Sequence, residues 1–327
     1  MNHRKIAEIA HVSTSTVSKA LSGSKEISSE VAEEIKRIAL EIGYFSEKNK
    51  RKLKNKRTKQ TQIAVLCPEI ISIHYSKIVT LIKSFVEERG GRVAVYIFDF
   101  DNEKKNDLLK YLSMDGNTDG IIVFSQYDSD VELGVPLVCF DTIRKYKNFD
   151  TIGTNQNECM NDCVRHLYDL GHRKIGFIGE NYTLSKEERF VESMRHFGLD
   201  INRDYIYNID KRFESIGREA AFEIIASQSR PTAFITAYDE IAVSLIYYLE
   251  NAGIRVPEDI SVMGMNDIPL SPYIRSSLTT VRFFYDEQAA LAVDILYDKM
   301  FGLSDDIHHL VVKHELVVRN STGKPRK

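Results

Sequence analysis

The chain of 327 residues lacks the features that mark several classes of protein. It contains no tryptophan, and its four cysteines form no CxxC pair: Cys67, Cys139, Cys159 and Cys163. Unpaired thiols are typical of a reducing compartment. No stretch approaches the roughly 18 consecutive apolar residues of a membrane-spanning helix, and the charged start differs from a signal peptide. We therefore expect a cytoplasmic protein that does not bind membranes.

Common enzyme motifs are also absent. The sequence has no G-x-S-x-G, H-E-x-x-H, P-loop or G-x-G-x-x-G, which are the signatures of several hydrolases, metalloproteases and nucleotide-binding enzymes. Its one histidine cluster is His308, His309 and His314, near the end of the chain. A solvated loop or a strand end explains that cluster better than a metal site does. We expect no enzyme activity, no metal and no cofactor.

The net charge of −3 is an average over two very different regions. Residues 1–60 contain 14 Lys and Arg against 7 Asp and Glu, which gives +7, whereas the remainder contains 30 against 40, which gives −10. A basic terminal module on an acidic body indicates a polyanionic partner, either nucleic acid or an anionic membrane. The basic run at residues 48–59 has only Leu53 as a large apolar residue, so nucleic acid is favoured.

Helical spacing predicts a helix-turn-helix at the start of the chain. Ile6, Ile9 and Ala10 form one apolar stripe, and Val17, Ala20 and Leu21 form a second one after a break at His11-Val12. Ser13 and Thr14 are residues of the type that caps a helix. A third helix is expected over residues 29–43, where Val31, Ile35, Ile38 and Ile42 are spaced by four, three and four. Three such stripes would meet in one small core.

The second of these helices carries short polar side chains and one cation outside its apolar stripe. They are Thr14, Ser15, Thr16, Ser18 and Lys19. Hydroxyl groups and a lysine suit a helix that lies in the major groove of DNA. The alternative is that these residues only cap and solvate a surface helix. The basic region that follows favours DNA contact.

Residues 4–22 closely resemble the DNA-binding headpiece of the lactose/galactose repressor family. The matching pieces are IAEIA, the run VSTSTVSK from Val12 to Lys19, and the ending at residues 41–44. The resemblance implies that Thr14, Ser15 and Lys19 reach base edges, and that Ser13, Thr16 and Ser18 hold phosphates. Lys19 replaces the more usual Arg, which weakens bidentate reading of guanine and predicts a different preferred operator.

The segment at residues 48–59 has eight cations in twelve positions. It reads either as a solvated linker or, by the resemblance, as a hinge helix that folds on operator DNA. The resemblance then assigns DNA contact to Arg51 and insertion into the minor groove to Leu53, which would kink the duplex. Lys50 stands where the family usually has a small residue that lets two hinge helices pack closely. The sequence therefore does not decide whether two such helices pack closely here.

From residue 62 onward, β-branched runs alternate with helical patterns. Strands are expected at residues 63–66, 93–98, 120–124, 137–140, 174–178, 232–236 and 260–264, and helices at 78–89, 158–170, 187–197, 216–227 and 241–252. This alternation predicts parallel sheets with crossover helices, and its length predicts two lobes. Ligands of such lobes bind beyond the carboxyl ends of the strands, where polar and aromatic residues suit a hydroxyl-rich ligand. Many of the same residues also suit helix caps and turns.

The body resembles the same family along nearly its whole length. Five motifs occur in the family's order and spacing: GHRKIGFIG, PTAFITAYDEIA, VPEDISVMGMNDIPLSPY, LTTVR and LVVRNST, which begin at residues 171, 231, 256, 278 and 316. The resemblance implies an all-α helix-turn-helix headpiece (1–45), a basic hinge (46–60) and an α/β, two-lobed body like a periplasmic binding protein (61–322). The N-lobe would comprise about 61–154 and 283–306, and the C-lobe about 155–280 and 310–322, with crossings near 152–156, 279–283 and 306–310.

The resemblance also assigns an effector-binding cleft between the lobes. Its residues would be Tyr75, Asp141, Lys186, Tyr238, Asp239, Asn266 and Tyr285. Several depart from the family pattern: Asn266 replaces the first residue of an Asp-Asp pair, Tyr238 replaces a common Asn, and Lys186 replaces an Arg. These departures leave the identity of a sugar-like effector open.

The sequence as a whole predicts a transcriptional repressor of a carbohydrate-utilisation operon. A homodimer would bind a pseudo-palindromic operator in double-stranded DNA, and a small sugar-like effector would change its affinity. The alternative is an activator, or a repressor that needs a corepressor, responding to a small molecule that is not a sugar. The helix-turn-helix argues against a periplasmic sugar carrier. An enzyme with an unrecognised site is a further alternative, and turnover of a bound sugar would reveal it.

Overall fold

A computed structural model describes residues 3–21, 27–28, 31–32, 34–35, 38, 60–124 and 133–326. The chain divides into two compact units, Met1–Thr61 and Gln62–Lys327. Arg51, Leu53 and most of the basic hinge lie outside the described residues.

The first unit is helical around a small apolar core. α1 (His3–Ala10) and α2 (Thr14–Leu21) are joined by a tight turn, in which the N–H of Val12 donates to the carbonyl of Ala7. Ser13 caps the N-terminus of α2, because its Oγ accepts a hydrogen bond from the N–H of Thr16 at 3.0 Å. The core residues are Ile6, Ala7, Val17, Ala20, Ile35 and Ile38. Residues 31–32, 34–35 and 38 are helical where described, and the predicted helix-turn-helix is confirmed.

Two predicted core positions of this unit are wrong. Ile9 is 45% exposed and Val31 is 37% exposed, whereas Ala7 is buried. The stripe on a short helix is narrow, and Ile6, Ala7 and Ala10 already cover the side of α1 that meets the other helices. Ile9 therefore falls on the solvent side of that stripe.

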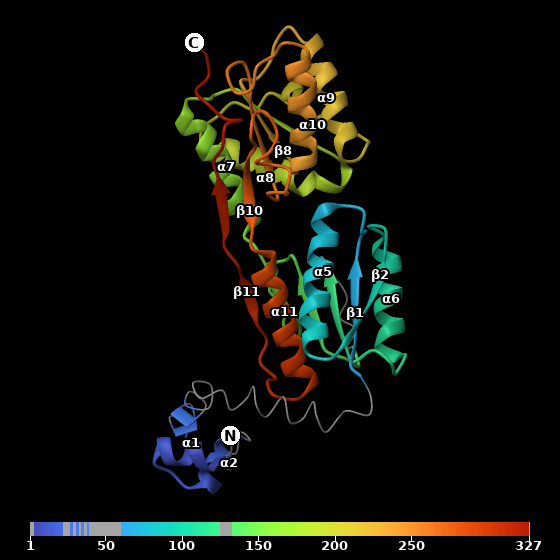
Figure 1. Cartoon of the computed structure of the whole chain (residues 1–327), viewed down its shortest axis with the longest axis vertical. Helices are drawn as coiled ribbons and strands as arrows, with labels where there is room; N and C mark the ends of the chain where they lie inside the picture. Colours follow the sequence, from blue (N-terminus) through green and yellow to red (C-terminus); the bar gives the residue numbers. More distant parts are fainter. Residues whose placement is uncertain are drawn as a thin grey trace. The chain divides into compact units, whose positions relative to one another are not determined.

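The N-lobe of the second unit is built on a parallel sheet of six strands. They are β1 (Gln62–Cys67), β2 (Arg92–Ile97), β3 (Gly120–Phe124), β4 (Leu137–Phe140), β5 (Asp150–Gly153) and β11 (His309–Val311), in the order β11-β5-β4-β3-β1-β2. α5 (Ile73–Glu88) and α11 (Tyr285–Met300) pack against each other (Figure 1). α6 (Asn102–Met114) covers the other face, where its Leu109 and Leu112 meet alternate residues of β1, β3 and β4.

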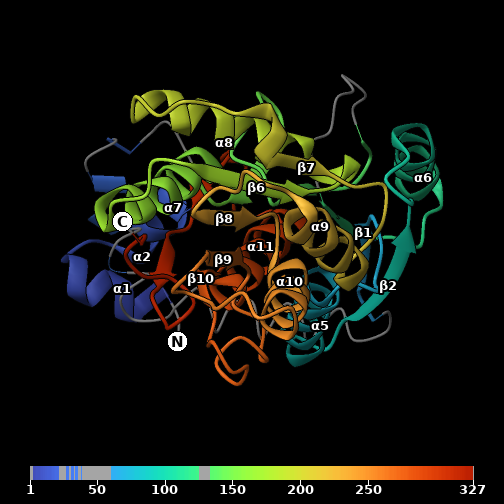
Figure 2. The ribbon, with the colours of Figure 1, turned by 90° about the horizontal axis from the view of Figure 1, so that it is seen from above.

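The C-lobe repeats this architecture with one antiparallel edge strand. Its strands are β6 (Ile175–Gly179), β7 (Ile206–Asn208), β8 (Ala233–Thr236), β9 (Ser261–Met265), β10 (Thr279–Phe283) and β12 (His314–Val317), in the order β12-β10-β9-β8-β6-β7. α7 (Gln156–Leu170) and α8 (Leu184–His196) pair on one face, and α9 (Glu214–Ala226) and α10 (Asp239–Asn251) on the other (Figure 2). Because helices cover both faces, most strands are continuous buried runs. The predicted α/β body with two lobes is confirmed.

Three connections join the lobes, and one of them lies later than predicted. The chain crosses between β5 and α7, between β10 and α11, and between β11 and β12. The third crossing was expected at 306–310, but His309–Val311 pairs with β5 of the N-lobe, so the crossing falls at residues 312–313. The C-lobe also extends past residue 322, because the carbonyl of Gly323 accepts a hydrogen bond from His172 Nε2 at 2.8 Å. The third crossing was misplaced because β11 and β12 are short and only two residues apart, so no sequence pattern marks the change of lobe.

Candidate functional site

A cavity of about 570 Å³ lies where the carboxyl ends of strands from both lobes face each other. Six of the seven predicted effector contacts line it: Tyr75, Asp141, Lys186, Tyr238, Asn266 and Tyr285. Each follows the end of a strand or begins the helix after it, which is why residues distant in sequence converge here. Their assignment as effector contacts stays a prediction.

Four side chains form a row along one wall of this cavity. Tyr285, at the first position of α11, donates its hydroxyl hydrogen to Asn266 Oδ1 at 3.2 Å. His74 Nδ1 lies 2.8 Å from the same hydroxyl oxygen, and His74 Nε2 lies 3.8 Å from Asp141 Oδ2. Asn266 belongs to the C-lobe and the other three belong to the N-lobe, so the row connects the lobes. His74 was not singled out from the sequence.

Burial controls the protonation of this row. It lowers the pKa of His74 to about 3, helped by the positive charges of Lys186 and Lys77. It raises the pKa of Asp141 to about 6, although Lys186 and Arg189 act in the opposite direction. At neutral pH His74 is therefore uncharged and Asp141 is ionised, so their contact is not an ion pair.

Lys186, in the first turn of α8, also lines the cavity. Its ammonium donates to the carbonyl of Ala237 at 2.7 Å. Burial lowers its pKa, while Asp141 acts to raise it. An anchored ammonium next to a carboxylate can orient a polar ligand without giving the cavity a net charge.

A second group of contacts joins the lobes through Arg212, which follows β7. Arg212 donates to Glu69 of the N-lobe at 2.5 Å, and its Nε lies 3.0 Å from Glu180 of the C-lobe. Tyr238 donates its hydroxyl hydrogen to Glu180 at 2.8 Å. The Arg212 guanidinium also lies 5.4 Å from the ring centre of Phe100. Sequence patterns gave no signal for Arg212, because its partners are far away in the chain.

An aromatic stack spans the lobes beside Arg212. The rings of Phe100 and Tyr182 lie 4.0 Å apart and are nearly parallel, at 16°. Phe100 comes from the N-lobe and Tyr182 from the C-lobe. We call Glu69, Phe100, Glu180, Tyr182 and Arg212 the interlobe contact.

The lining of the cavity is balanced in charge among the described residues. It has four carboxylates and four basic side chains: Glu69, Asp141, Glu180, Glu240, Arg144, Lys186, Arg189 and Arg212. Tyrosine and phenylalanine rings supply the apolar surface. Glu240 Oε2 is buried without a hydrogen bond inside the described structure. The cavity therefore suits an uncharged ligand with hydroxyl groups and C–H faces.

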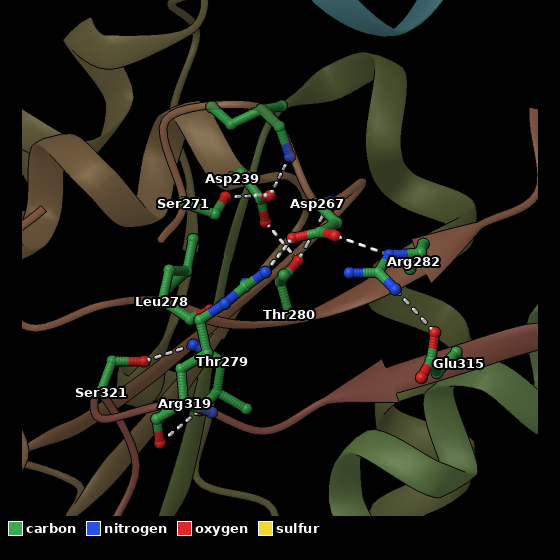
Figure 3. A network of polar contacts seen from close by, with 11 residues as sticks. Asp239, Asp267, Ser271, Leu278, Thr279, Thr280, Arg282, Glu315, Arg319 and Ser321 are labelled. Carbon is green, nitrogen blue, oxygen red and sulfur yellow. Dashed lines mark hydrogen bonds and ion pairs between the residues drawn. The ribbon is translucent and has the colours of Figure 1, made fainter. Parts of the chain in front are cut away.

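Asp239 does not line the cavity, so the structure does not support its predicted role as an effector contact. Its carboxylate is buried and accepts three hydrogen bonds, from Thr280 Oγ1 at 2.6 Å, Ser271 Oγ at 2.8 Å and the N–H of Ile268 at 2.9 Å (Figure 3). Burial raises its pKa to about 7 against these donors. The carboxylate points into the C-lobe, where it ties α10 to β10 and to the loop after β9.

A polar network next to Asp239 fixes the backbone that carries Asn266. Asp267 accepts from Arg282 Nε and from Arg319, both at 2.7 Å, and Arg282 also pairs with Glu315 at 2.9 Å (Figure 3). Asn266 and Asp267 both have positive φ, 109° and 47°, which is unfavourable without support. The network supports this turn by joining β10 and β12 to it.

The first unit presents a polar helix face. Thr14, Ser15, Ser18 and Lys19 are exposed on α2. Thr16 is partly exposed, and its hydroxyl lies 2.8 Å from that of Ser13. The predicted DNA contacts on α2 are thus accessible, apart from the groups that cap the helix, and their assignment stays a prediction.

The three clustered histidines have separate partners. His308 contacts Asp150 at 3.2 Å, His309 contacts Thr151 at 3.0 Å and His314 contacts Asp162 at 2.9 Å. Among the described residues, no group of three or more His, Cys, Asp or Glu is arranged to hold a metal. Within the same residues, no helix has the length and hydropathy needed to span a membrane.

Two family models match the chain. Residues 4–47 match the bacterial regulatory proteins of the lacI family, and residues 164–322 match a periplasmic binding protein-like domain. The first match covers the helix-turn-helix, and the second covers the C-lobe from the middle of α7 onward together with α11 and β11 of the N-lobe.

Full-length relatives agree with both matches. The chain is 28% identical over 328 residues to the ribose operon repressor of Haemophilus influenzae, with 97% of each chain covered. It is 27% identical over 329 residues to the transcriptional repressor PurR of Photobacterium profundum, with 97% of each covered. A lacI-family regulator from Lactobacillus casei with bound glucose has a similar fold, with a TM-score of 0.71, 22% identity, and coverage of 80% of this chain and 100% of that one. The chain is therefore similar to the lacI family of bacterial regulatory proteins in its first unit, and to a periplasmic binding protein-like domain in its second.

Proposed function

We propose that the protein is a DNA-binding transcriptional repressor of carbohydrate-utilisation genes, and that a sugar in the interlobe cavity changes its affinity for operator DNA. The observation that carries this proposal is a charge-balanced cavity with tyrosine rings and hydroxyl-binding groups, in a chain that begins with an exposed helix-turn-helix face. Both parts are needed for a regulator that responds to a small molecule.

The cavity supports a neutral sugar rather than a sugar phosphate. Of the four basic side chains in the lining, Arg212 is engaged by two carboxylates and Lys186 is bound to the carbonyl of Ala237. Arg189 donates to Asn157 Oδ1 and to the carbonyl of Ser185, and the Arg144 guanidinium lies over the ring of Tyr146. A phosphate would need an arginine or lysine that can turn toward it. The ribose operon repressor and the glucose-bound regulator are relatives whose names point to the same class of ligand.

DNA recognition is assigned to α2 and to the basic segment after the headpiece. Thr14, Ser15 and Lys19 would contact base edges, with Ser13, Thr16 and Ser18 near phosphates. Arg51 and Leu53 would act in the minor groove at the centre of the site. A homodimer, acting in the bacterial cytoplasm where chromosomal operators lie, would match the two halves of a pseudo-palindromic operator.

Coupling between the two sites requires that the sugar bind one lobe arrangement better than another. The row from Asp141 to Asn266 and the interlobe contact are the parts of the cavity that depend on that arrangement. A coupling of about 1–3 kcal/mol would change operator affinity by roughly 5- to 150-fold. The sugar acts here as a signal and is not transformed.

The experiment is to recover the genomic fragments that the protein binds, and to place one upstream of a reporter. The reporter is then read with and without D-ribose, D-glucose, D-galactose and cellobiose, in cells that carry the wild-type protein or Asp141→Ala. We expect repression that one of these sugars relieves, and a variant that represses but no longer responds. Enhanced repression by a compound would identify a corepressor. Absence of any response to sugars would reject the effector class while leaving DNA binding intact.

A further inference from the structure

The row of side chains along the cavity wall fixes where the hydrogen on His74 resides. The Tyr285 hydroxyl has a single hydrogen, and it donates that hydrogen to Asn266 Oδ1. The same oxygen lies 2.8 Å from His74 Nδ1, so it accepts a hydrogen bond from that nitrogen. With Asn266 Oδ1 as the acceptor of the Tyr285 hydrogen, this arrangement assigns the hydrogen of His74 to Nδ1 and leaves a lone pair on Nε2.

That lone pair faces a second acceptor. His74 Nε2 lies 3.8 Å from Asp141 Oδ2. Neither atom carries a hydrogen at neutral pH, so they repel each other weakly. A hydroxyl group placed about 2.8 Å from both would satisfy the two together.

We propose that His74 and Asp141 form a double acceptor that selects a hydroxyl donor of the effector, which makes His74 a specificity-determining residue. This proposal rests on the proposed function, because it names how a sugar is recognised in the same cavity. Groups that only accept hydrogen bonds, such as an ether oxygen or a phosphate oxygen, would face two acceptors and be rejected. A donor hydroxyl at this point also contacts the row that ends on Asn266 of the C-lobe.

The double acceptor depends on pH through Asp141. The groups that face Asp141 are His74 and Tyr75 from α5, Tyr285 from α11, and Lys186 and Arg189 from α8. Burial raises the pKa of Asp141 to about 6, whereas His74, with a pKa of about 3, stays neutral. Below pH 6 the protonated Asp141 can donate to His74 Nε2 and so compete with the effector hydroxyl. Sugar binding should therefore weaken as the pH falls through 6.

The test is isothermal titration calorimetry on the full chain with D-ribose, D-glucose, D-galactose and cellobiose at pH 7.5. For the tightest of these sugars, His74→Phe should weaken binding about 10-fold or more, because it keeps a ring but removes the acceptor. Asp141→Asn should weaken it similarly, since the amide replaces one acceptor oxygen with a donor. The matched controls are His196→Phe and Asp204→Asn, which change exposed residues away from the cavity.

Repeating the titration at pH 5 tests the same pair without a mutation. Wild-type affinity should fall about 10-fold, because roughly nine-tenths of Asp141 is protonated one unit below its pKa. Asp141→Asn should show no such loss. Binding by His74→Phe equal to the wild type, or an affinity that does not change with pH, would overturn the double acceptor while leaving the sugar effector in place.

A failure of the proposed function has a different signature, because no sugar would then bind even the wild type, and the double acceptor would fall with it. Nitrogen-15 spectra of the His74 ring show which ring nitrogen carries the hydrogen, and this measurement does not require sugar binding. They should show hydrogen on Nδ1 from pH 5 to 8. Hydrogen on Nε2 would overturn the proposal, and thermal melting of each variant shows whether it is folded.

Discussion

Asp141 and Asp239 both come just after a buried parallel strand, yet their carboxylates have different surroundings. Asp141 points into the cavity next to His74. Asp239 turns inward because Gly264 leaves room for it: a Cβ at Gly264 would collide with Asp239 Oδ1. The carboxylate then accepts three hydrogen bonds inside the C-lobe. One residue type at one kind of position therefore has two different roles.

Asp239→Ala should lower stability without acting directly on the effector. It leaves the Thr280 hydroxyl, the Ser271 hydroxyl and the Ile268 N–H without their acceptor, at a cost of about 3 kcal/mol. For a unit of this size the melting temperature should fall by about 6–12 °C. Asp141→Ala is the matched comparison, and it should melt within about 2 °C of the wild type while losing the response to sugar. If Asp239→Ala melted normally and lost sugar binding, Asp239 would be an effector contact after all.

For single residues, the sequence predicted the place of a residue in the fold better than the direction of its side chain. Six of seven cavity residues could be placed because residues after parallel strands meet at one edge. The direction of Asp239 depends on a glycine twenty-five positions later, which no local pattern reveals. His74 and Arg212 were missed for a related reason: their importance comes from Tyr285, Asp141, Glu69 and Glu180, which become neighbours only in the folded chain.

Among the secondary-structure elements, buried strands with mainly apolar residues were predictable, and strands with polar residues were not. Residues 120–124 and 233–236 are uninterrupted apolar runs, typical of strands covered on both faces. β5 contains Asp150 and Thr151, and β11 and β12 contain histidines and a glutamate and lie only two residues apart, although they belong to different sheets. Pairing partners decide such strands, and pairing is a property of the whole sheet.

The loops after β1 and β7 meet in the interlobe contact, which should help to keep the lobes together. Arg212→Ala should leave Glu69 and the buried Glu180 facing each other as like charges, which costs about 2 kcal/mol. We expect a wider average separation of the lobes in the absence of sugar. Fluorescence energy transfer between dyes on Asp107→Cys and Glu192→Cys would measure it, since the four native cysteines are buried.

Arg203→Ala is the control for this experiment, because Arg203 pairs with Glu187 inside the C-lobe. It should leave the transfer efficiency unchanged. Equal efficiencies for wild type and Arg212→Ala would show that the interlobe contact does not hold the cavity closed.

The exposed face of α2 leads to a separate prediction about sequence-specific DNA binding. If Lys19 reads a base edge, Lys19→Ala should weaken binding to the operator by roughly 10-fold or more, and weaken binding to a scrambled duplex much less. Fluorescence anisotropy on the two duplexes, at several salt concentrations, measures the difference. Lys110→Ala, an exposed lysine on α6 of the body, is the control. An equal loss on both duplexes would assign Lys19 to phosphate contact instead.

Across the whole molecule, the distribution of charge separates the part expected to bind DNA from the part expected to bind the effector. The +7 of residues 1–60 attracts DNA, and the −10 of the remainder repels it. The interlobe cavity lies in the acidic unit, and the helix-turn-helix lies in the basic one. If an effector in the cavity changes DNA affinity, the two binding equilibria are linked, and each ligand changes the affinity of the other by the same factor.

Linkage between sugar binding and DNA binding tests most directly whether a sugar in the cavity controls operator affinity. The dissociation constant for operator DNA is measured with and without saturating sugar, and that for the sugar with and without saturating operator. Thermodynamic reciprocity requires both ratios to be the same factor, and we predict a value of roughly 5 to 150, with the sugar weakening DNA binding. Asp141→Ala should reduce the response to sugar while retaining the operator affinity of the sugar-free protein. A factor of one in both directions, with sugar bound, would contradict the account.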